Sequence, residues 1–164
     1  MNIIIQERDL RIFRFINGMR NGDADILGCY FFTSRVTARI RLNLLSSKGY
    51  LRKCSSLSPN GYIRYRLTKK SYSLMRSYFS QVNIPKMYSG VKFFDSQHER
   101  MIAISRLYLV KNNISDGYLA EREIASEMIA QNQTIKRRFL PDAIFYNKQT
   151  RVSWFLEAMS LMIS

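Results

Sequence analysis

Residues 34–67 constrain the fold most, because they join one helical pattern to two strand patterns in a short stretch of chain. Ser34 carries a hydroxyl that can cap a helix by accepting a hydrogen bond from a free amide of the first turn. Three apolar residues recur after it at helical spacing: Ala38, Leu42 and Leu45. Gly49 tolerates the left-handed conformation that ends many helices. The pattern predicts a helix over Arg35–Lys48.

Two strand patterns follow this helix, at Tyr50–Ser55 and Tyr62–Leu67. The second alternates aromatic or aliphatic residues with arginines, as a half-buried strand does. Ser58–Gly61, between the two, has the composition of a turn. A cationic helix followed by a cationic hairpin is typical of a winged helix-turn-helix, whose helix enters the major groove of DNA while the hairpin contacts the flanking backbone.

This layout predicts two sets of DNA-binding residues. The helix set, which we expect to face the groove, is Arg35, Thr37, Arg39, Arg41 and Asn43. The hairpin set, which we expect to hold the phosphate backbone, is Arg52, Lys53, Arg64 and Arg66. The alternative is that these charges only solvate a surface.

The distribution of charge favours a polyanionic partner over simple solvation. Residues 26–94 contain thirteen Lys or Arg and no Asp or Glu, whereas a solvated surface normally mixes both signs. The chain carries a formal net charge of +14, of which residues 1–92 hold +13 and residues 93–164 hold +1. Potential of one sign concentrates a polyanion at the cost of self-repulsion, so we expect double-stranded DNA as the partner of the first part.

Several other classes of function are disfavoured by composition. His98 is the only histidine, so one chain cannot build a histidine-based metal cluster or a histidine-relayed nucleophile of its own. The seven glycines form no phosphate-binding loop pattern. The two cysteines have no metal-ligand spacing, and no apolar run approaches membrane-spanning length. We therefore expect a cytoplasmic protein without membrane contact.

The remaining patterns predict an α+β chain with two domains. Residues 1–81 add three helices to the winged-helix pattern, at Glu7–Arg20, Asp23–Phe31 and Lys69–Gln81. Residues 82–92, which contain Pro85 and Gly90, are the predicted linker. Residues 93–164 form the predicted second domain. Its predicted elements are a helix over 96–111, a strand over 118–121, a helix or irregular arm over 123–131 and a hairpin with strands 143–146 and 152–156.

The end of the chain resembles the PD-(D/E)xK nuclease motif. Pro141-Asp142 precedes the predicted hairpin, and Glu157-Ala158-Met159 follows its second strand. The resemblance implies that Asp142 and Glu157 hold Mg²⁺ or Mn²⁺ through hard oxygen ligands, with Glu99 as a third acid from the preceding helix. A metal-dependent DNA nuclease or relaxase using these three residues is the enzymatic alternative.

The first part is similar to the winged helix of replication-relaxation proteins and of MobC-type relaxases of mobilisable plasmids. The similarity is carried by Glu7–Ile12, Gly49–Leu51 and Tyr65–Thr68, and His98 also fits the pattern. These families join a winged helix to a PD-(D/E)xK-like domain. The resemblance implies a sequence-specific or structure-specific DNA-binding protein of a plasmid or mobile element, acting in mobilisation, replication or transcription control.

Two departures from the nuclease motif favour a catalytically inactive second domain. The motif's lysine position holds Met159, which can neither polarise water nor bind phosphate. The sequence also ends five residues later, before the final helix and strand of that fold. Three further interpretations stay open: the two acids have no joint role, they bind metal without turnover, or the second domain mainly forms a homodimer. DNA binding itself requires no cofactor in any of them.

Overall fold

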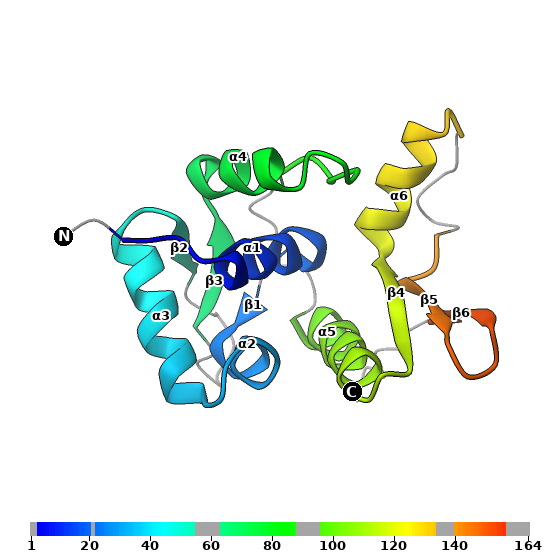
Figure 1. Ribbon diagram of the computed structural model, residues 1–164, viewed down its shortest axis with the longest axis horizontal. Coiled ribbons are helices and arrows are strands. Elements are labelled where there is room, and N and C mark those ends of the chain that lie inside the picture. The colour runs from blue at the N-terminus through cyan, green and yellow to red at the C-terminus, as the bar shows by residue number, and fades with distance from the viewer. Residues whose placement is uncertain (1–2, 21, 55–62, 88–95, 134–139, 157–164) are drawn as a thin grey trace, which may run out of the picture. The chain divides into compact units, whose positions relative to one another are not determined.

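The computed structural model describes residues 3–20, 22–54, 63–87, 96–133 and 140–156 (Figure 1). The chain is an α+β protein that forms two compact units, Met1–Tyr88 and Ser89–Ser164. The boundary between the units falls inside the predicted linker. None of the described helices is long and apolar enough to cross a membrane.

The part of the first unit that the structure describes contains four helices and a three-stranded antiparallel sheet with strand order β1-β3-β2. In chain order its elements are α1 (Glu7–Met19), β1 (Gly22–Asp23), α2 (Ala24–Phe31), α3 (Arg35–Ser47), β2 (Leu51–Cys54), β3 (Arg64–Leu67) and α4 (Lys69–Tyr78). The four predicted helices and two predicted strands are all confirmed to within a few residues. Strand β1 was not predicted, and the predicted turn at Ser58–Gly61 lies outside the described residues.

Helix α1 supplies the centre of the first unit's core. It packs between α2 and α4 and against β3, as Figure 1 shows. The apolar residues whose helical spacing in the sequence predicts an inward side are all buried: Leu10, Phe13, Phe15 and Ile16. Tyr65 of β3 and Met75 of α4 complete this core with almost no exposed surface. The apolar spacing of α1 therefore sufficed to predict which side of the helix faces inward.

The first part of the predicted linker belongs to the first unit. Pro85 is buried, and its carbonyl oxygen accepts hydrogen bonds from Asn17 Nδ2 at 2.9 Å and from Tyr72 Oη at 3.2 Å. Asn17 lies on α1 and Tyr72 on α4. Pro85 thus ties this part of the chain to the two helices, while residues 88–92 of the predicted linker lie outside the described residues.

The described residues of the second unit form two helices and a three-stranded antiparallel sheet with strand order β4-β5-β6. Its elements are α5 (Ser96–Lys111), β4 (Ser115–Ala120), α6 (Glu121–Ala130), β5 (Ala143–Asn147) and β6 (Val152–Leu156). The turn between β5 and β6 is closed by a hydrogen bond from Arg151 N to Asn147 O at 2.9 Å. Both helices pack against β4.

Helix α5 turns a different side inward from the one its apolar spacing predicts. That spacing favours a packing face of Met101, Ile104, Leu107 and Tyr108. In the structure Leu107 is buried together with Ile102 and Ala103, whereas Met101, Ile104 and Tyr108 are exposed. Helix α5 is apolar on more than one side, so periodicity alone could not choose between them.

Candidate nucleic-acid interface

Helix α3 begins and ends where local signals predict. Ser34 Oγ accepts a hydrogen bond from Thr37 N at 3.1 Å, which caps the first turn. At the other end, Gly49 has a φ of 73° and Tyr50 N donates to Leu45 O at 2.9 Å. This six-to-one bond across a left-handed glycine is the Schellman arrangement, and it directs the chain from α3 into β2.

The inner side of α3 is tightly packed. Ala38, Leu42 and Leu45 have no exposed surface. Gly28 of α2 lies so close to α3 that an added Cβ atom would be 3.2 Å from the Arg35 Cα atom. Any larger residue at Gly28 would push α2 and α3 apart. The position of α3 is thus set by close packing as well as by its caps.

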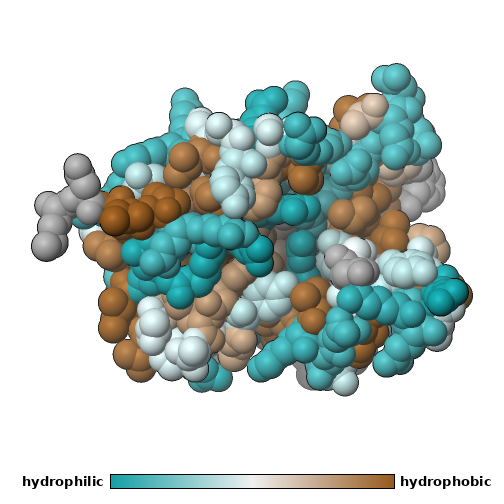
Figure 2. All heavy atoms as spheres, viewed as in Figure 1, coloured by the Kyte–Doolittle hydropathy of each residue, from teal (hydrophilic) through white to brown (hydrophobic). Residues whose placement is uncertain are grey.

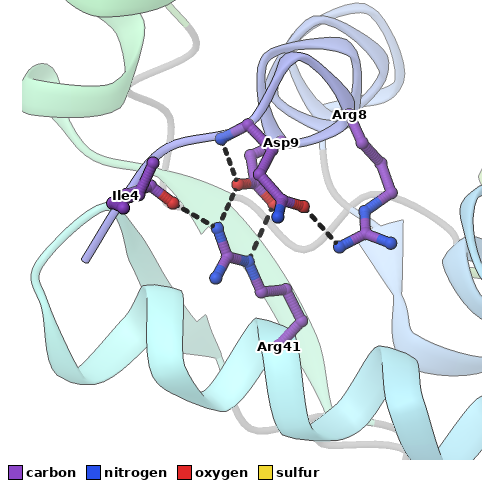
Figure 3. Close-up of polar contacts among 5 residues, drawn as sticks. Ile4, Arg8, Asp9 and Arg41 are labelled. Carbon is purple, nitrogen blue, oxygen red and sulfur yellow. Dashed lines mark hydrogen bonds and ion pairs between the residues drawn. The ribbon is translucent and has the colours of Figure 1, made fainter.

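Arg41 holds α3 to the start of α1 through a buried ion pair with Asp9 (Figure 3). Its Nε donates to Asp9 Oδ1 at 3.0 Å, and its Nη2 donates both to Asp9 Oδ2 and, at 2.8 Å, to the carbonyl oxygen of Ile4. Asp9 Oδ2 also accepts from the backbone N–H of Gln6 at 2.9 Å, which caps α1. One carboxylate therefore both starts α1 and anchors α3.

This network gives Arg41 a structural role. Its side chain is only 16% exposed and that of Asp9 is 0% exposed. The hydrogen bond to Asp9 raises the pKa of Arg41, with burial acting in the opposite direction. Because Asp9 and the Ile4 carbonyl bind the Arg41 guanidinium, it does not lie on the exposed side of the helix with Arg39. We therefore remove Arg41 from the predicted groove-facing set.

Arg35 and Arg39 do lie on an exposed side of α3, one turn apart. Their side chains are about two-thirds exposed, and their nearest acid is Asp25 of α2. Asp25 Oδ1 lies 3.9 Å from Arg35 Nε and 3.5 Å from Arg39 Nη2. Exposed pairs at such distances contribute little to stability, so both guanidiniums can be recruited by a stronger anion.

Thr37 and Asn43 are also exposed, and each is oriented by a hydrogen bond. Thr37 Oγ1 lies 2.9 Å from Ser34 Oγ at the start of the helix. Asn43 Oδ1 accepts from the hydroxyl of Tyr65 at 3.1 Å. Burial raises the pKa of Tyr65, and the charge of Arg39 partly offsets this shift. Tyr65 therefore remains a neutral donor and leaves the two N–H groups of the Asn43 amide for other acceptors.

The register of β2 and β3 divides the four hairpin cations between two faces. Arg52 is directly opposite Arg66, and Cys54 is opposite Arg64, so the three arginines share one face. Lys53 is opposite the buried Tyr65 and belongs to the other face. Lys53 is nevertheless exposed, because β2 is an edge strand of this sheet. The predicted set of four is one arginine cluster and one separate lysine.

The outermost side of α3 carries an apolar row that was not predicted. Val36 and Ile40 are 67% and 65% exposed, and Leu44 is 38% exposed. Positions two residues apart on a helix lie about 200° apart around its axis, so Val36 and Ile40 point away from Ala38 and Leu42. Figure 2 shows hydrophobic residues along this outer edge of α3. The signal was present in the sequence as a second apolar series at i, i+4 and i+8.

The acids of the first unit are confined to α1 and to the start of α2. Glu7 pairs with Arg11 at 2.6 Å, Asp9 with Arg41, and Asp25 with the two arginines of α3. Asp23 caps α2 by accepting from Ile26 N at 2.7 Å. Residues 26–94 contain no acid, so every charged side chain of β2, β3, α4 and the exposed side of α3 is a cation.

The predicted metal site in the second unit is only partly described. Glu157 and Met159 lie outside the described residues. Asp142 precedes β5, and its Oδ1 lies 3.0 Å from His98 Nε2, near the start of α5. Within the described part of the chain, no three His, Cys, Asp or Glu side chains are grouped as metal ligands, so Glu99 does not complete a site there with His98 and Asp142.

A buried ion pair braces the second unit. Arg106 Nη1 of α5 donates to Glu123 Oε2 of α6 at 2.9 Å, and the same oxygen accepts from Ala120 N at 3.0 Å. The guanidinium also lies 5.3 Å from the centre of the Tyr118 ring. Burial raises the pKa of Tyr118, whose hydroxyl donates to Ile102 O at 3.2 Å. These groups connect α5, β4 and α6, which is a structural role.

Comparison with protein-family models, with curated proteins and with solved structures found no match to this chain.

Proposed function

We propose that this chain is a double-stranded DNA-binding protein whose first unit acts as a winged helix. Helix α3 would enter the major groove, and the β2–β3 hairpin would hold the flanking phosphate backbone. The observation that carries the proposal is the exposed, acid-free side of α3 with Arg35 and Arg39, next in the chain to a hairpin whose Arg52, Arg64 and Arg66 share one face.

The order of elements supports this proposal. Helix, short strand, two helices and two antiparallel strands follow one another in the first unit, and β1 pairs with β3 at the side opposite β2. This order supports the proposal of a winged helix-turn-helix, in which the helix before the hairpin would be the recognition helix. The network of Asp9 and Arg41 anchors that helix without using its exposed side.

The electrostatics support a nucleic acid as the polyanion. DNA presents a regular array of phosphates, and each phosphate that is neutralised releases condensed counterions. Arg35 and Arg39 lie 3.9 and 3.5 Å from one acid, Asp25, whereas the arginines of the hairpin belong to a segment without acids. Guanidinium groups suit this task because their planar fork can bind phosphate or guanine through two hydrogen bonds.

The proposal is tested by duplex binding as a function of salt. If about five to eight phosphates are neutralised, log K should fall against log salt with a slope of about −4 to −7. Lys111→Ala, an exposed cation at the end of α5, is the matched control and should leave the slope unchanged. Absence of binding at low salt, or a flat response, would contradict the proposal.

The biological setting that we propose follows from the family resemblance. The chain would act in plasmid or mobile-element mobilisation, replication or transcription control, in the cytoplasm, and its second unit would contribute a dimer contact or a nuclease-like module without turnover. The position of Asp142 immediately before the β5–β6 hairpin fits the nuclease-like arrangement.

A metal-dependent nuclease is the second candidate, and Met159 at the motif's lysine position argues against it. The contact between His98 Nε2 and Asp142 Oδ1 at 3.0 Å does not bear on this choice, because a hydrogen-bonded carboxylate can still ligate a metal. We expect no cleavage of supercoiled, linear or single-stranded DNA with Mg²⁺ or Mn²⁺. Cleavage that is lost in both Asp142→Ala and Glu157→Ala would establish the enzyme, whereas cleavage that survives both changes would come from a contaminant.

A further inference from the structure

The apolar row on the outer side of α3, formed by Val36, Ile40 and Leu44, does not belong to the buried core of the first unit. Its members are 67%, 65% and 38% exposed, and the core side of the same helix is filled by other residues. The row lies beside the exposed guanidiniums of Arg35 and Arg39. Whatever covers it must therefore present apolar groups within a strongly anionic surface.

We propose that this row reads thymine methyl groups in the major groove, an inference that rests on the proposed function and specifies its base preference. The thymine C5-methyl is the apolar feature of the major-groove edge of a base pair, and aliphatic side chains recognise it by contact. The row selects A·T-containing sites, while the arginines at its side bind phosphates or guanines.

The dimensions of the row fit the spacing of base pairs. Eight residues separate Val36 from Leu44, and at the rise of an α-helix this distance is about 12 Å. Base pairs repeat every ~3.4 Å along a strand, so the row spans roughly three to four steps. Recognition helices of this type contact bases mainly with their N-terminal residues, which gives Val36 and Ile40 the larger share.

Two other occupants fit the surroundings less well. A second copy docking through the same row would bring two acid-free cationic helices together, and like charges at an interface oppose association. A lipid surface requires a wide apolar face, whereas this row is one residue wide and is bordered by Arg39, Asn43 and Thr37.

The test removes the methyl group without changing the rest of the base pair. Binding of the full chain is measured to duplexes of about thirty base pairs of alternating dA-dT and of alternating dA-dU. Wild-type protein should prefer the thymine duplex by about fourfold for each methyl group that it buries. A second pair of probes, alternating dI-dC with and without 5-methylcytosine, places a methyl at the same groove position and should show the same direction.

Variants assign the preference to the row. Ile40→Ala and Val36→Ala should each reduce the preference for thymine over uracil by up to about fourfold, without changing the salt slope. Ile129→Ala removes an equally exposed isoleucine from α6 and should keep the full preference. Because all three side chains are exposed, the thermal transition should stay where it is in the wild type.

The outcomes separate this inference from the proposed function. Equal binding to thymine and uracil duplexes, or a preference that survives both Val36→Ala and Ile40→Ala, would overturn the methyl-reading role and leave DNA binding intact. No binding to any duplex would overturn the proposed function and the inference with it. A free protein whose sedimentation shows a dimer that Ile40→Ala dissociates would assign the row to a second copy.

Discussion

Each unit holds one helix in place with a buried pair of a carboxylate and an arginine, but the exposed residues beside the two pairs differ. Asp9 and Glu123 are each the third residue of a helix, and each accepts a hydrogen bond from the backbone N–H three residues earlier. Each also pairs with an arginine from another helix, Arg41 in the first unit and Arg106 in the second. All four side chains are largely buried.

The two units differ in the residues that surround the helix bearing the arginine. Arg41 belongs to α3, whose outward side carries exposed cations and an apolar row. Arg106 belongs to α5, in a unit where positive and negative residues nearly balance. The same buried pair therefore positions a proposed binding helix in the first unit, whereas in the second unit it only braces α5 against α6. The proposed DNA binding depends on the exposed residues beside the pair.

The largest expected effect comes from breaking the first pair. Arg41→Met leaves the fully buried Asp9 without its counter-charge, and removing one partner of a buried pair costs about 3–5 kcal/mol. The loss is measured by urea unfolding followed by far-UV circular dichroism. The single tryptophan, Trp154 on β6, reports the second unit, so its fluorescence transition should move much less.

A double variant checks the origin of that cost. If the loss comes from an uncompensated charge, adding Asp9→Asn to Arg41→Met should recover part of the stability. If the double variant loses the full sum of the two single losses, the pair would contribute nothing as a pair.

Breaking the second pair should separate stability from binding. Glu123→Gln keeps an acceptor for Ala120 N but removes the buried negative charge that pairs with Arg106, and we expect a loss of about 3 kcal/mol. Here the Trp154 fluorescence transition should move, while the affinity for duplex DNA at fixed salt stays within about twofold. A large fall in affinity would show that the second unit takes part in the interface.

Within the first unit, two arginines should behave differently. Arg39→Ala on α3 should cost about 1–3 kcal/mol on a preferred sequence and remove discrimination between sequences. Arg64→Ala on the hairpin should weaken all sequences about equally and flatten the salt slope by about one. Titration of both variants against a preferred and an unrelated duplex would decide; identical behaviour would mean that α3 is not the recognition helix.

The smallest expected effect has opposite signs for stability and binding. Arg52 and Arg66 are directly opposite each other on one face of the antiparallel pair, and like charges in that position are destabilising. Arg52→Thr should therefore stabilise the first unit by about 0.2–1 kcal/mol in urea unfolding, while the affinity for DNA falls. Lys53→Thr, one residue along on the other face, is the control and should give no gain in stability.

Local chemistry explains which predictions from the sequence were correct. The bounds of α3 depend on Ser34 and Gly49, which act on backbone groups within a few residues of themselves. The inward side of α1 follows from a single apolar series at helical spacing. Helix α5 has apolar residues on several sides, and there the same reasoning selected Ile104 and Tyr108, which are exposed. The sequence was sufficient where one pattern had no competitor.

By itself, the sequence determined the α+β class, the helix bounds, the acid-free segment and the concentration of charge in the first 92 residues. Only the tertiary structure decided how Arg41 is used. Helical spacing already places Arg41 about 200° around the axis from Arg39, but only the structure shows that Asp9, 32 residues earlier, binds it. Val36 and Ile40 are exposed because the side of α3 that packs on α2 and the sheet is filled by Ala38, Leu42 and Leu45. The ion pair of Arg41 depends on a partner distant in the chain, and no pattern within α3 indicates which residue that partner is.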